Sequence, residues 1–246
     1  MTTSVPAFDA AAIRAVAFDL DGTLADTLGD FHAAISAMLV ELSLPPIARE
    51  TVSNFVGKGT EHLLHSVLAC VAPSAHRTPE DTQSLYAAAW GHYMRHYEAL
   101  NGQHTALYPG VLEGLARLRA AGLPLACVTN KPEGFARTLL ARKDIADCFA
   151  VVAGGDTYER KKPDPMPLVG TARLLGVAPQ ALLMVGDSVN DAQAARAAGC
   201  PVVLVPYGYN HGVPVDGIDA DGVVPDLDTL APVSYTHLTL PTILLV

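Results

Sequence analysis

At 246 residues, the chain is long enough to bury one ordinary domain core together with a smaller inserted unit. Its formal net charge of −9, with only 16 Lys and Arg residues, argues against a nucleic-acid partner, because binding a phosphate backbone usually requires a basic surface. The sequence also shows no signal peptide or membrane span, and its four cysteines form neither a metal-ligand pattern nor a close-spaced disulfide framework. We therefore expect a cytoplasmic protein without membrane or nucleic-acid partners.

The first predicted element is a buried strand that leads into two carboxylates. An apolar run over residues 15–18 stops at Asp19, and Asp21 follows ahead of a Gly-Thr turn. Burying two acids so close together is costly unless a cation or a shared proton intervenes, so the pair indicates a metal site or acid/base chemistry. Taken alone, the Asp-Gly step would more often be only a solvated turn.

The next part of the chain predicts helices and no strand. Apolar residues recur at helical spacing, and prolines and glycines separate the helical runs. The predicted helices are 28–42, 61–71 and 79–100. Strands and helices alternate only after about Thr105, so the pattern predicts an all-helical cap domain, residues 26–105, inserted into a core formed by residues 1–25 and 106–233.

The remainder of the chain predicts repeated strand–helix units with nearly continuous apolar strands. The predicted strands are 123–130, 150–153, 181–187 and 202–205, and the predicted helices are 112–121, 133–142, 166–175 and 189–198. Such units form a parallel sheet that is covered on both faces, with a site at the carboxyl ends of the strands. The predicted fold class is therefore α/β, with a Rossmann-like parallel sheet, helices on both faces and the inserted helical cap.

Polar residues follow the predicted strands where each one ends. Thr129 and Asn130 end one predicted strand, Lys162 lies on a later loop, and Asp187 ends another strand, with Asp191 four residues later. Each has an ordinary structural interpretation, since Thr129 could be a common strand-end hydroxyl, Lys162 a solvated charge and Asp187 a helix cap. Their convergence on one crevice with the first two acids is the argument for a functional site.

The string Asp19-Leu-Asp-Gly-Thr resembles the first motif of the haloacid dehalogenase-like hydrolases, a superfamily of mostly Mg2+-dependent phosphatases and phosphomutases. The resemblance implies that Asp19 is a nucleophile that forms an aspartyl-phosphate. It also implies that Asp21 protonates the leaving alkoxide and later activates water, a division that suits phosphoryl transfer. The dehalogenase branch lacks the second Asp, so Asp21 favours phosphoryl chemistry.

The second and third motifs of the superfamily also have counterparts. Thr129 stands where the second motif has Thr or Ser, and Lys162, directly before a proline, matches the lysine of the third motif. The resemblance implies that Thr129, Asn130 and Lys162 bind the phosphate, with Thr129 and Lys162 belonging to the catalytic set. A hydroxyl with adjacent backbone amides suits a phosphate oxygen, and the lysine balances the charges of nucleophile and phosphate.

The fourth motif, glycine and aspartate followed by a second aspartate four places on, matches Asp187 and Asp191. The resemblance implies a Mg2+ site formed by Asp19, Asp187 and the backbone carbonyl of Asp21, and oxygen ligands of this kind suit Mg2+. Asp191 is assigned a supporting role, in which it holds Lys162 or a metal-bound water.

The cap and the chain after the last strand narrow the expected substrate. Gly57-Lys-Gly59 could cradle an anion, although two glycines more often form only a turn. Because cap loops select substrates in this superfamily, Gly57, Lys58 and Gly59 are predicted to meet the non-phosphate end of the substrate. Tyr207-Gly-Tyr-Asn210 resembles bacterial phosphoglycolate phosphatases and favours that subgroup.

The resulting expectation is a Mg2+-dependent phosphatase of a small phosphorylated metabolite, with 2-phosphoglycolate as the first choice, acting as a monomer or homodimer. Rivals are a sugar phosphomutase of the β-phosphoglucomutase type, a pyrophosphatase of the same superfamily, and a catalytically silent binding protein on the same fold. Residues 234–246 resemble a translated vector tail and are left out of the fold prediction, although their β-branched content also allows a genuine terminal segment.

Overall fold

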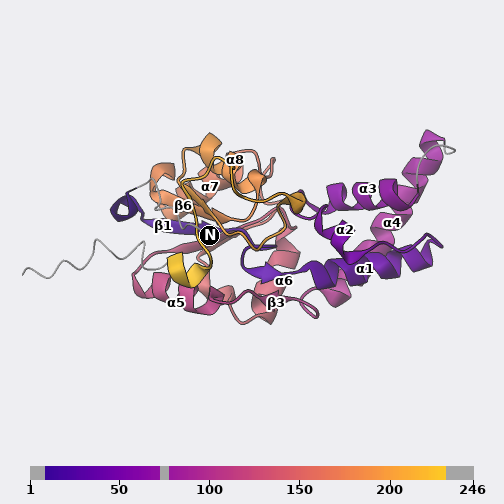
Figure 1. The fold of residues 1–246 in the computed structure, drawn as a ribbon, viewed down its shortest axis with the longest axis horizontal. Helices are drawn as coiled ribbons and strands as arrows, with labels where there is room; N and C mark the ends of the chain where they lie inside the picture. Colours follow the sequence, from indigo (N-terminus) through magenta and orange to yellow (C-terminus); the bar gives the residue numbers. More distant parts are fainter. Residues whose placement is uncertain (1–8, 73–77, 231–246) are drawn as a thin grey trace, which may run out of the picture.

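The computed structural model describes residues 9–72 and 78–230, and its centre is a parallel sheet of six strands (Figure 1). The order across the sheet is β5 (Val151–Ala153), β4 (Leu125–Val128), β1 (Ala15–Phe18), β6 (Leu182–Gly186), β7 (Val202–Leu204) and β8 (Gly222–Val223). Every neighbouring pair is parallel, so the predicted α/β class with a parallel sheet is confirmed. The predicted tail at 234–246 lies outside the described residues.

Helices cover both faces of this sheet, and β1 shows why. One face carries α5 (Val111–Ala120) and α6 (Glu133–Arg142), and the other carries α7 (Met166–Leu175) and α8 (Val189–Ala198). Val16 and Phe18 belong to the hydrophobic cluster of the first face, whereas Ala15 and Ala17 belong to that of the second. Because successive side chains of a strand point to opposite faces, a strand that is apolar at every position is buried on both.

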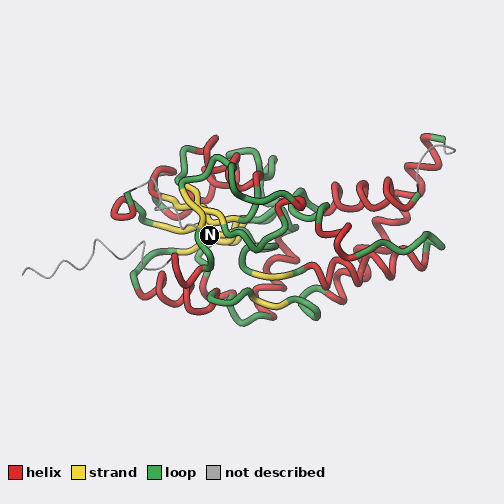
Figure 2. Tube along the Cα trace, viewed as in Figure 1, coloured by secondary structure: helices red, strands yellow, loops and turns green. Residues whose placement is uncertain are grey.

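A separate group of helices occupies the chain between β1 and β4. These helices are α1 (Leu28–Glu41), α2 (Arg49–Ser53), α3 (Thr60–Val71) and α4 (Pro79–Leu100). Figure 2 shows them gathered at the end of the molecule away from the six-stranded sheet. They share a third hydrophobic cluster that includes Ile35, Leu64 and Tyr93. The sequence did not predict α2, whose five residues bury only Val52 and therefore carry little apolar periodicity.

Two short strands connect this helical group to the sheet. β2 (Ala25–Asp26) pairs antiparallel with β3 (Ala106–Leu107), so the outgoing and returning segments lie side by side. The buried carboxylate of Asp30 accepts hydrogen bonds from the backbone N–H groups of Gly102 and His104, both at 2.6 Å. These contacts fasten the two crossings to each other, while the exact residue limits of a cap domain stay a prediction.

The predicted helices agree closely with the observed ones, and the predicted strands after the helical group are each longer than the observed strands. The strand predicted over 123–130 is observed as β4, because its last residues turn into the loop that carries the site. Helix α8 begins with a capping box formed by Ser188 and Asp191, and it is followed by the C-cap residue Gly199, whose φ of 76° is left-handed. Short 3-10 helices lie at Ala10–Ala12, Ala146–Cys148, Pro179–Ala181 and Asn210–Gly212. Among the described helices, none has the length and apolar character of a membrane span.

Candidate active site

The candidate site lies at the carboxyl ends of β4, β1 and β6, three strands that are neighbours in the sheet. Phe18, the last residue of β1, is in register with Cys127 of β4 and Val185 of β6, so the loops that follow these strands begin at the same edge. A pocket there is lined by Asp19, Asp21 and the loop after β4. The helical group closes the pocket from the opposite side. Its contributions include Phe31, Val56, Gly57, Gly59, Leu63 and Tyr97.

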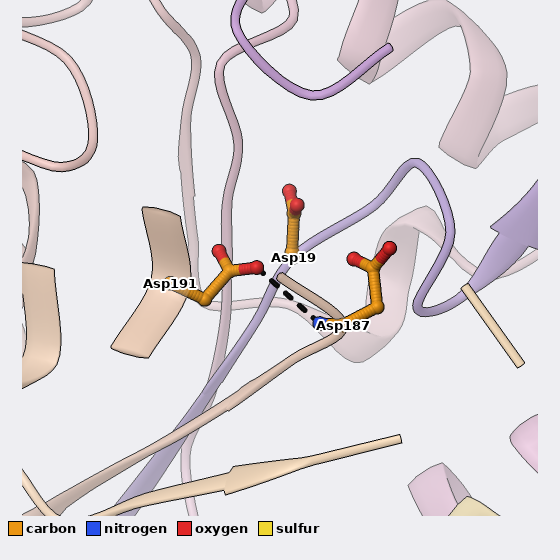
Figure 3. Close-up of side chains that lie close together, drawn as sticks. All are labelled: Asp19, Asp187 and Asp191. Atoms are coloured by element: carbon orange, nitrogen blue, oxygen red, sulfur yellow. Dashed lines mark hydrogen bonds between the residues drawn. The ribbon is translucent and has the colours of Figure 1, made fainter. Parts of the chain in front are cut away.

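Three acids predicted from two different motifs meet in the crevice (Figure 3). One carboxylate oxygen from each of Asp19, Asp187 and Asp191 lies within 4.8 Å of the others, and all three residues are buried. Asp187 is held by the Thr23 hydroxyl at 3.0 Å and by the backbone N–H of Tyr209 at 2.7 Å. The distances between the acids reflect strand register and hydrogen bonding, since β1 and β6 are direct neighbours.

Lys162 forms ion pairs with two of these three acids. Its ammonium lies 2.6 Å from Asp191 Oδ1 and 3.1 Å from Asp19 Oδ1, and it also donates to the carbonyl of Val128 at 2.7 Å. Burial by itself would lower the pKa of Lys162, but the Asp19 and Asp191 carboxylates outweigh it and raise that pKa above its ordinary value. Lys162 is therefore a fixed positive charge beside Asp19.

The acids outnumber this lysine, and their environment favours a further cation. Burial, opposed by Lys162 and reinforced by Asp191, raises the pKa of Asp19 to about 6. Burial and the neighbouring Asp191 and Asp19 charges raise the pKa of Asp187 well above its ordinary value. A divalent cation would neutralise the excess negative charge, and carboxylate oxygens are hard donors of the type that Mg2+ and Ca2+ prefer. The donor set thus fits a divalent metal.

Asp21 stands apart from the three acids and pairs with a lysine that the sequence analysis missed. Lys131 Nζ donates to Asp21 Oδ1 at 2.8 Å, and both side chains are almost fully buried. The ammonium also lies 4.4 Å from the ring centroid of Phe31 and 5.1 Å from that of Tyr97. The position of Lys131, directly after the strand-end residues of β4, was the available signal, but the partners from α1 and α4 are visible only in the fold.

The loop after β4 places Thr129 and Asn130 beside the acids, in the same pocket. The Thr129 hydroxyl accepts from the backbone N–H of Lys131 at 3.2 Å. The side-chain amide of Asn130 donates to the carbonyls of Lys162 at 2.8 Å and Gly57 at 3.0 Å. Asn130 therefore connects the β4 loop to the loop of Lys162 and to the helical group.

The glycine-rich turn before α3 closes over the crevice, but its three residues differ in position. Gly57 and Gly59 have φ values of 107° and 91°, which favour glycine, and both line the pocket with Asp19 and Asp21. Lys58 is exposed and lines a neighbouring hollow that also contains His62 and Lys161. The structure thus brings the two glycines, and not the Lys58 side chain, to the pocket that contains both acids of the first motif.

Tyr209, from the segment that suggested a subgroup, joins the site to the crossing between sheet and helices. Its hydroxyl accepts from the backbone N–H groups of Thr27 at 2.7 Å and Leu28 at 3.0 Å, and donates to Asp26 at 2.7 Å. Its own N–H donates to Asp187. One residue therefore contacts both a proposed metal ligand and the start of α1.

The family of the chain follows from comparison with known proteins. The family model for haloacid dehalogenase-like hydrolases matches residues 16–205, a span that contains all the acids and lysines described above. The chain belongs to the haloacid dehalogenase-like hydrolase family, as its motifs predicted.

Within this family, the chain is similar to several phosphoglycolate phosphatases. A phosphoglycolate phosphatase of Thiobacillus denitrificans is 45% identical over 215 residues, which cover 87% of this chain and 92% of the relative. The phosphoglycolate phosphatase of Escherichia coli (strain K12) is 40% identical over 231 residues, with 89% and 92% covered. The crystal structure of a predicted phosphoglycolate phosphatase from Haemophilus somnus 129pt superposes with a TM-score of 0.86 at 30% identity and covers 91% of this chain and 98% of its own.

Proposed function

We propose that this protein is a Mg2+-dependent phosphatase that hydrolyses 2-phosphoglycolate to glycolate and phosphate through an aspartyl-phosphate on Asp19. The observation that carries the proposal is the crevice in which Asp19 lies beside Lys162 and within reach of Asp187, with Asp21 in the same pocket. The similarity to phosphoglycolate phosphatases supports the choice of substrate. An intact set of acids argues against a silent binding protein.

Asp19 is oriented for attack. Its Oδ1 accepts from the backbone N–H of Leu20 at 2.7 Å and lies 3.1 Å from Lys162 Nζ, so Oδ2 is the oxygen proposed to attack phosphorus. The new bond from Oδ2 to phosphorus forms as the bond from phosphorus to the ester oxygen breaks. Lys162 stays charged throughout and balances the nucleophile and the phosphoryl oxygens.

Asp21 moves the protons in both halves of the reaction. It donates a proton to the departing ester oxygen, so that glycolate leaves as an alcohol, and the resulting carboxylate then takes a proton from water. That water attacks phosphorus, releases phosphate and restores Asp19. Thr129 and Asn130 are proposed to position the phosphate at the end of β4, close to both acids.

Mg2+ would be held by Asp19, Asp187 and the backbone carbonyl of Asp21, and when bound it supplies positive charge to the phosphoryl oxygens. Asp191 has a different proposed role, because Lys162 at 2.6 Å and the Ser188 hydroxyl at 2.7 Å occupy its oxygens. It fixes Lys162 and the start of α8. We further propose that residues 26–105 act as a cap, with Gly57 and Gly59 facing the substrate and Lys58 beside them on the outer side of the turn, and that the protein acts in the cytoplasm.

A two-substrate assay tests the proposed reaction. The purified protein is incubated with 2-phosphoglycolate and, separately, with β-glucose 1-phosphate in the presence of Mg2+. The proposal expects free phosphate from phosphoglycolate and no glucose 6-phosphate. Formation of glucose 6-phosphate without phosphate release would identify a phosphomutase instead, since a mutase uses the same acids and keeps water from the aspartyl-phosphate.

A further inference from the structure

Lys131 is a buried lysine of the candidate active site, and it belongs to none of the four sequence motifs. It is 4% exposed and lies on the loop after β4, where its backbone N–H donates to the Thr129 hydroxyl and its carbonyl accepts from Gly155 at 2.8 Å. These contacts fix the backbone, so the side chain is directed across the pocket toward Asp21. A buried ammonium is costly unless it is paired, so this position needs an explanation.

The Lys131 ammonium has N–H donors that its contacts within the protein do not use, and these could bind a ligand. It carries three N–H donors, and among residues 9–72 and 78–230 its one hydrogen-bond partner is Asp21. The rings of Phe31 and Tyr97 lie near it and attract the charge through their faces, but they accept no conventional hydrogen bond. A second anionic oxygen could therefore bind Lys131 without displacing Asp21.

The chemistry of the proposed substrate supplies such an oxygen. In 2-phosphoglycolate the carboxylate carbon is two bonds from the ester oxygen, the atom that Asp21 must approach in order to protonate it. Lys131, at 2.8 Å from Asp21, is thus next to the place where the carboxylate of a bound 2-phosphoglycolate would lie. With the phosphate at its proposed position beside Asp19, the carboxylate would lie on the Lys131 side of Asp21.

We propose, resting on the proposed phosphatase function, that Lys131 is the specificity-determining residue that binds the substrate carboxylate. Phe31 and Tyr97, buried and contributed by α1 and α4, hold the ammonium in place and exclude water from it. The preferred substrates are therefore short phosphoesters of 2-hydroxy acids. The exposed Lys58 lines a different hollow and is the weaker candidate for this task.

The test compares two substrates that differ in the carboxylate. 2-Phosphoglycolate and ethyl phosphate share the phosphate and the ester oxygen, but ethyl phosphate has a methyl group in place of the carboxylate. For Lys131→Met, the ratio of kcat/KM for phosphoglycolate to that for ethyl phosphate should fall by about tenfold to a hundredfold, the range of a hydrogen bond to a charged group. The ratio is the readout because any disturbance of Asp21 lowers both activities together.

A second variant separates charge from fold and from the contact with Asp21. Lys131→Gln is neutral but still able to donate to Asp21, and it should lower the ratio as Lys131→Met does. It decides the matter if the methionine variant does not fold. Affinity provides an independent readout, because phosphoglycolate should bind Asp19→Asn protein more tightly than Asp19→Asn/Lys131→Gln protein in calorimetric titrations.

The outcomes distinguish this inference from the proposed function. If the wild type prefers phosphoglycolate and both Lys131 variants keep that preference, the inference is wrong and the function stands. If the variants lose both activities equally, Lys131 only positions Asp21, and carboxylate binding is again refuted. A wild type with no preference for phosphoglycolate over ethyl phosphate refutes the proposed substrate and the role of Lys131 together.

Discussion

The strand-end crevice and the helical group meet at one pocket but contribute different kinds of atoms to it. The crevice supplies buried charges, including Asp19, Lys162 and Asp187, each of which makes a hydrogen bond to a backbone group. The helical group supplies apolar side chains such as Phe31 and Tyr97, together with the backbone of the glycine-rich turn. Lys131 lies between them, since its backbone belongs to the loop after β4 and its ammonium lies against the aromatic rings of Phe31 and Tyr97.

The difference suggests that the crevice carries out the proposed chemistry and that the helical group selects the substrate. In the proposed reaction, the charges in the crevice act on the phosphate, which every substrate of this class shares, whereas the helical group acts on the part of the substrate that varies. Substitutions in the crevice should therefore reduce every activity, and substitutions on the helical side should change the ranking of substrates. Five measurements test this division, beginning with the largest expected effect.

Asp19→Asn should abolish turnover of every phosphoester while the protein stays folded, because an amide can neither attack phosphorus nor offer a charged oxygen to a metal. Steady-state phosphate release measures the loss, and circular dichroism checks the fold. Asp219→Asn, at an exposed acid that pairs with Arg196, is the matched control and should retain wild-type activity. Activity near the wild-type value in Asp19→Asn would refute its assignment as the nucleophile.

Removal of divalent metal with EDTA should abolish activity, and added Mg2+ should restore it. The reason is the excess of buried acids over lysine in the crevice, where Asp19, Asp187 and Asp191 lie within 4.8 Å. Phosphate release and elemental analysis of the same sample provide the measurement. Full activity in a preparation verified to be free of metal would contradict the metal site.

Asp21→Asn should lower the rate with phosphoglycolate by on the order of a hundredfold to ten-thousandfold, the usual contribution of a general acid. The loss of the phosphorylation step should be smaller with an aryl phosphate, because a phenolate leaves with little need of a proton. Burst kinetics separate this step from hydrolysis of the intermediate. Equal losses in the burst rates of both substrates would show that Asp21 is not the acid.

Stability of the metal-free protein should depend on pH through Asp19. Its pKa is raised from 3.8 to about 6, so the folded state binds this proton more tightly than the unfolded state does. The stabilisation is present below about pH 4 and is lost as the pH rises through 6, with a size on the order of 3 kcal/mol. In EDTA, Asp19→Asn should therefore have a higher Tm than the wild type at pH 7. A Tm difference that does not change between pH 4 and pH 7 would contradict the assigned shift.

Lys58→Ala should have the smallest effect, a change of less than about threefold in the preference for phosphoglycolate over an aryl phosphate, because exposed charges interact weakly. The side chain is exposed and lines the hollow beside the pocket. If this variant instead loses phosphoglycolate activity selectively, Lys58 of the glycine-rich turn binds the substrate carboxylate, as the sequence first suggested. The helical group would then contribute a charge to substrate binding as well as apolar side chains.

The amino-acid sequence by itself predicted five of the six sheet strands, the helices that follow β1 and the polar side chains that meet at the strand ends. The apolar strands that stop at Asp19, Thr129 and Asp187 can be predicted from short stretches of sequence, because a strand end is marked by the residues next to it. Since parallel strands meet at one edge, the same local pattern also predicted that these side chains would converge. The boundaries of the longer helices followed from periodicity and capping residues in the same way, whereas α2 is too short to show such a pattern.

Only the tertiary structure decided which partners these residues have. Lys131 became part of the site because α1 and α4 bring Phe31 and Tyr97 against it, and Lys58 was separated from the pocket although its two neighbours line it. Tyr209, on the loop after β7, accepts a hydrogen bond from Leu28 at the start of α1, more than 180 residues earlier in the chain. Such contacts depend on how separate elements pack against one another, and packing joins positions too far apart along the chain to form a local sequence pattern.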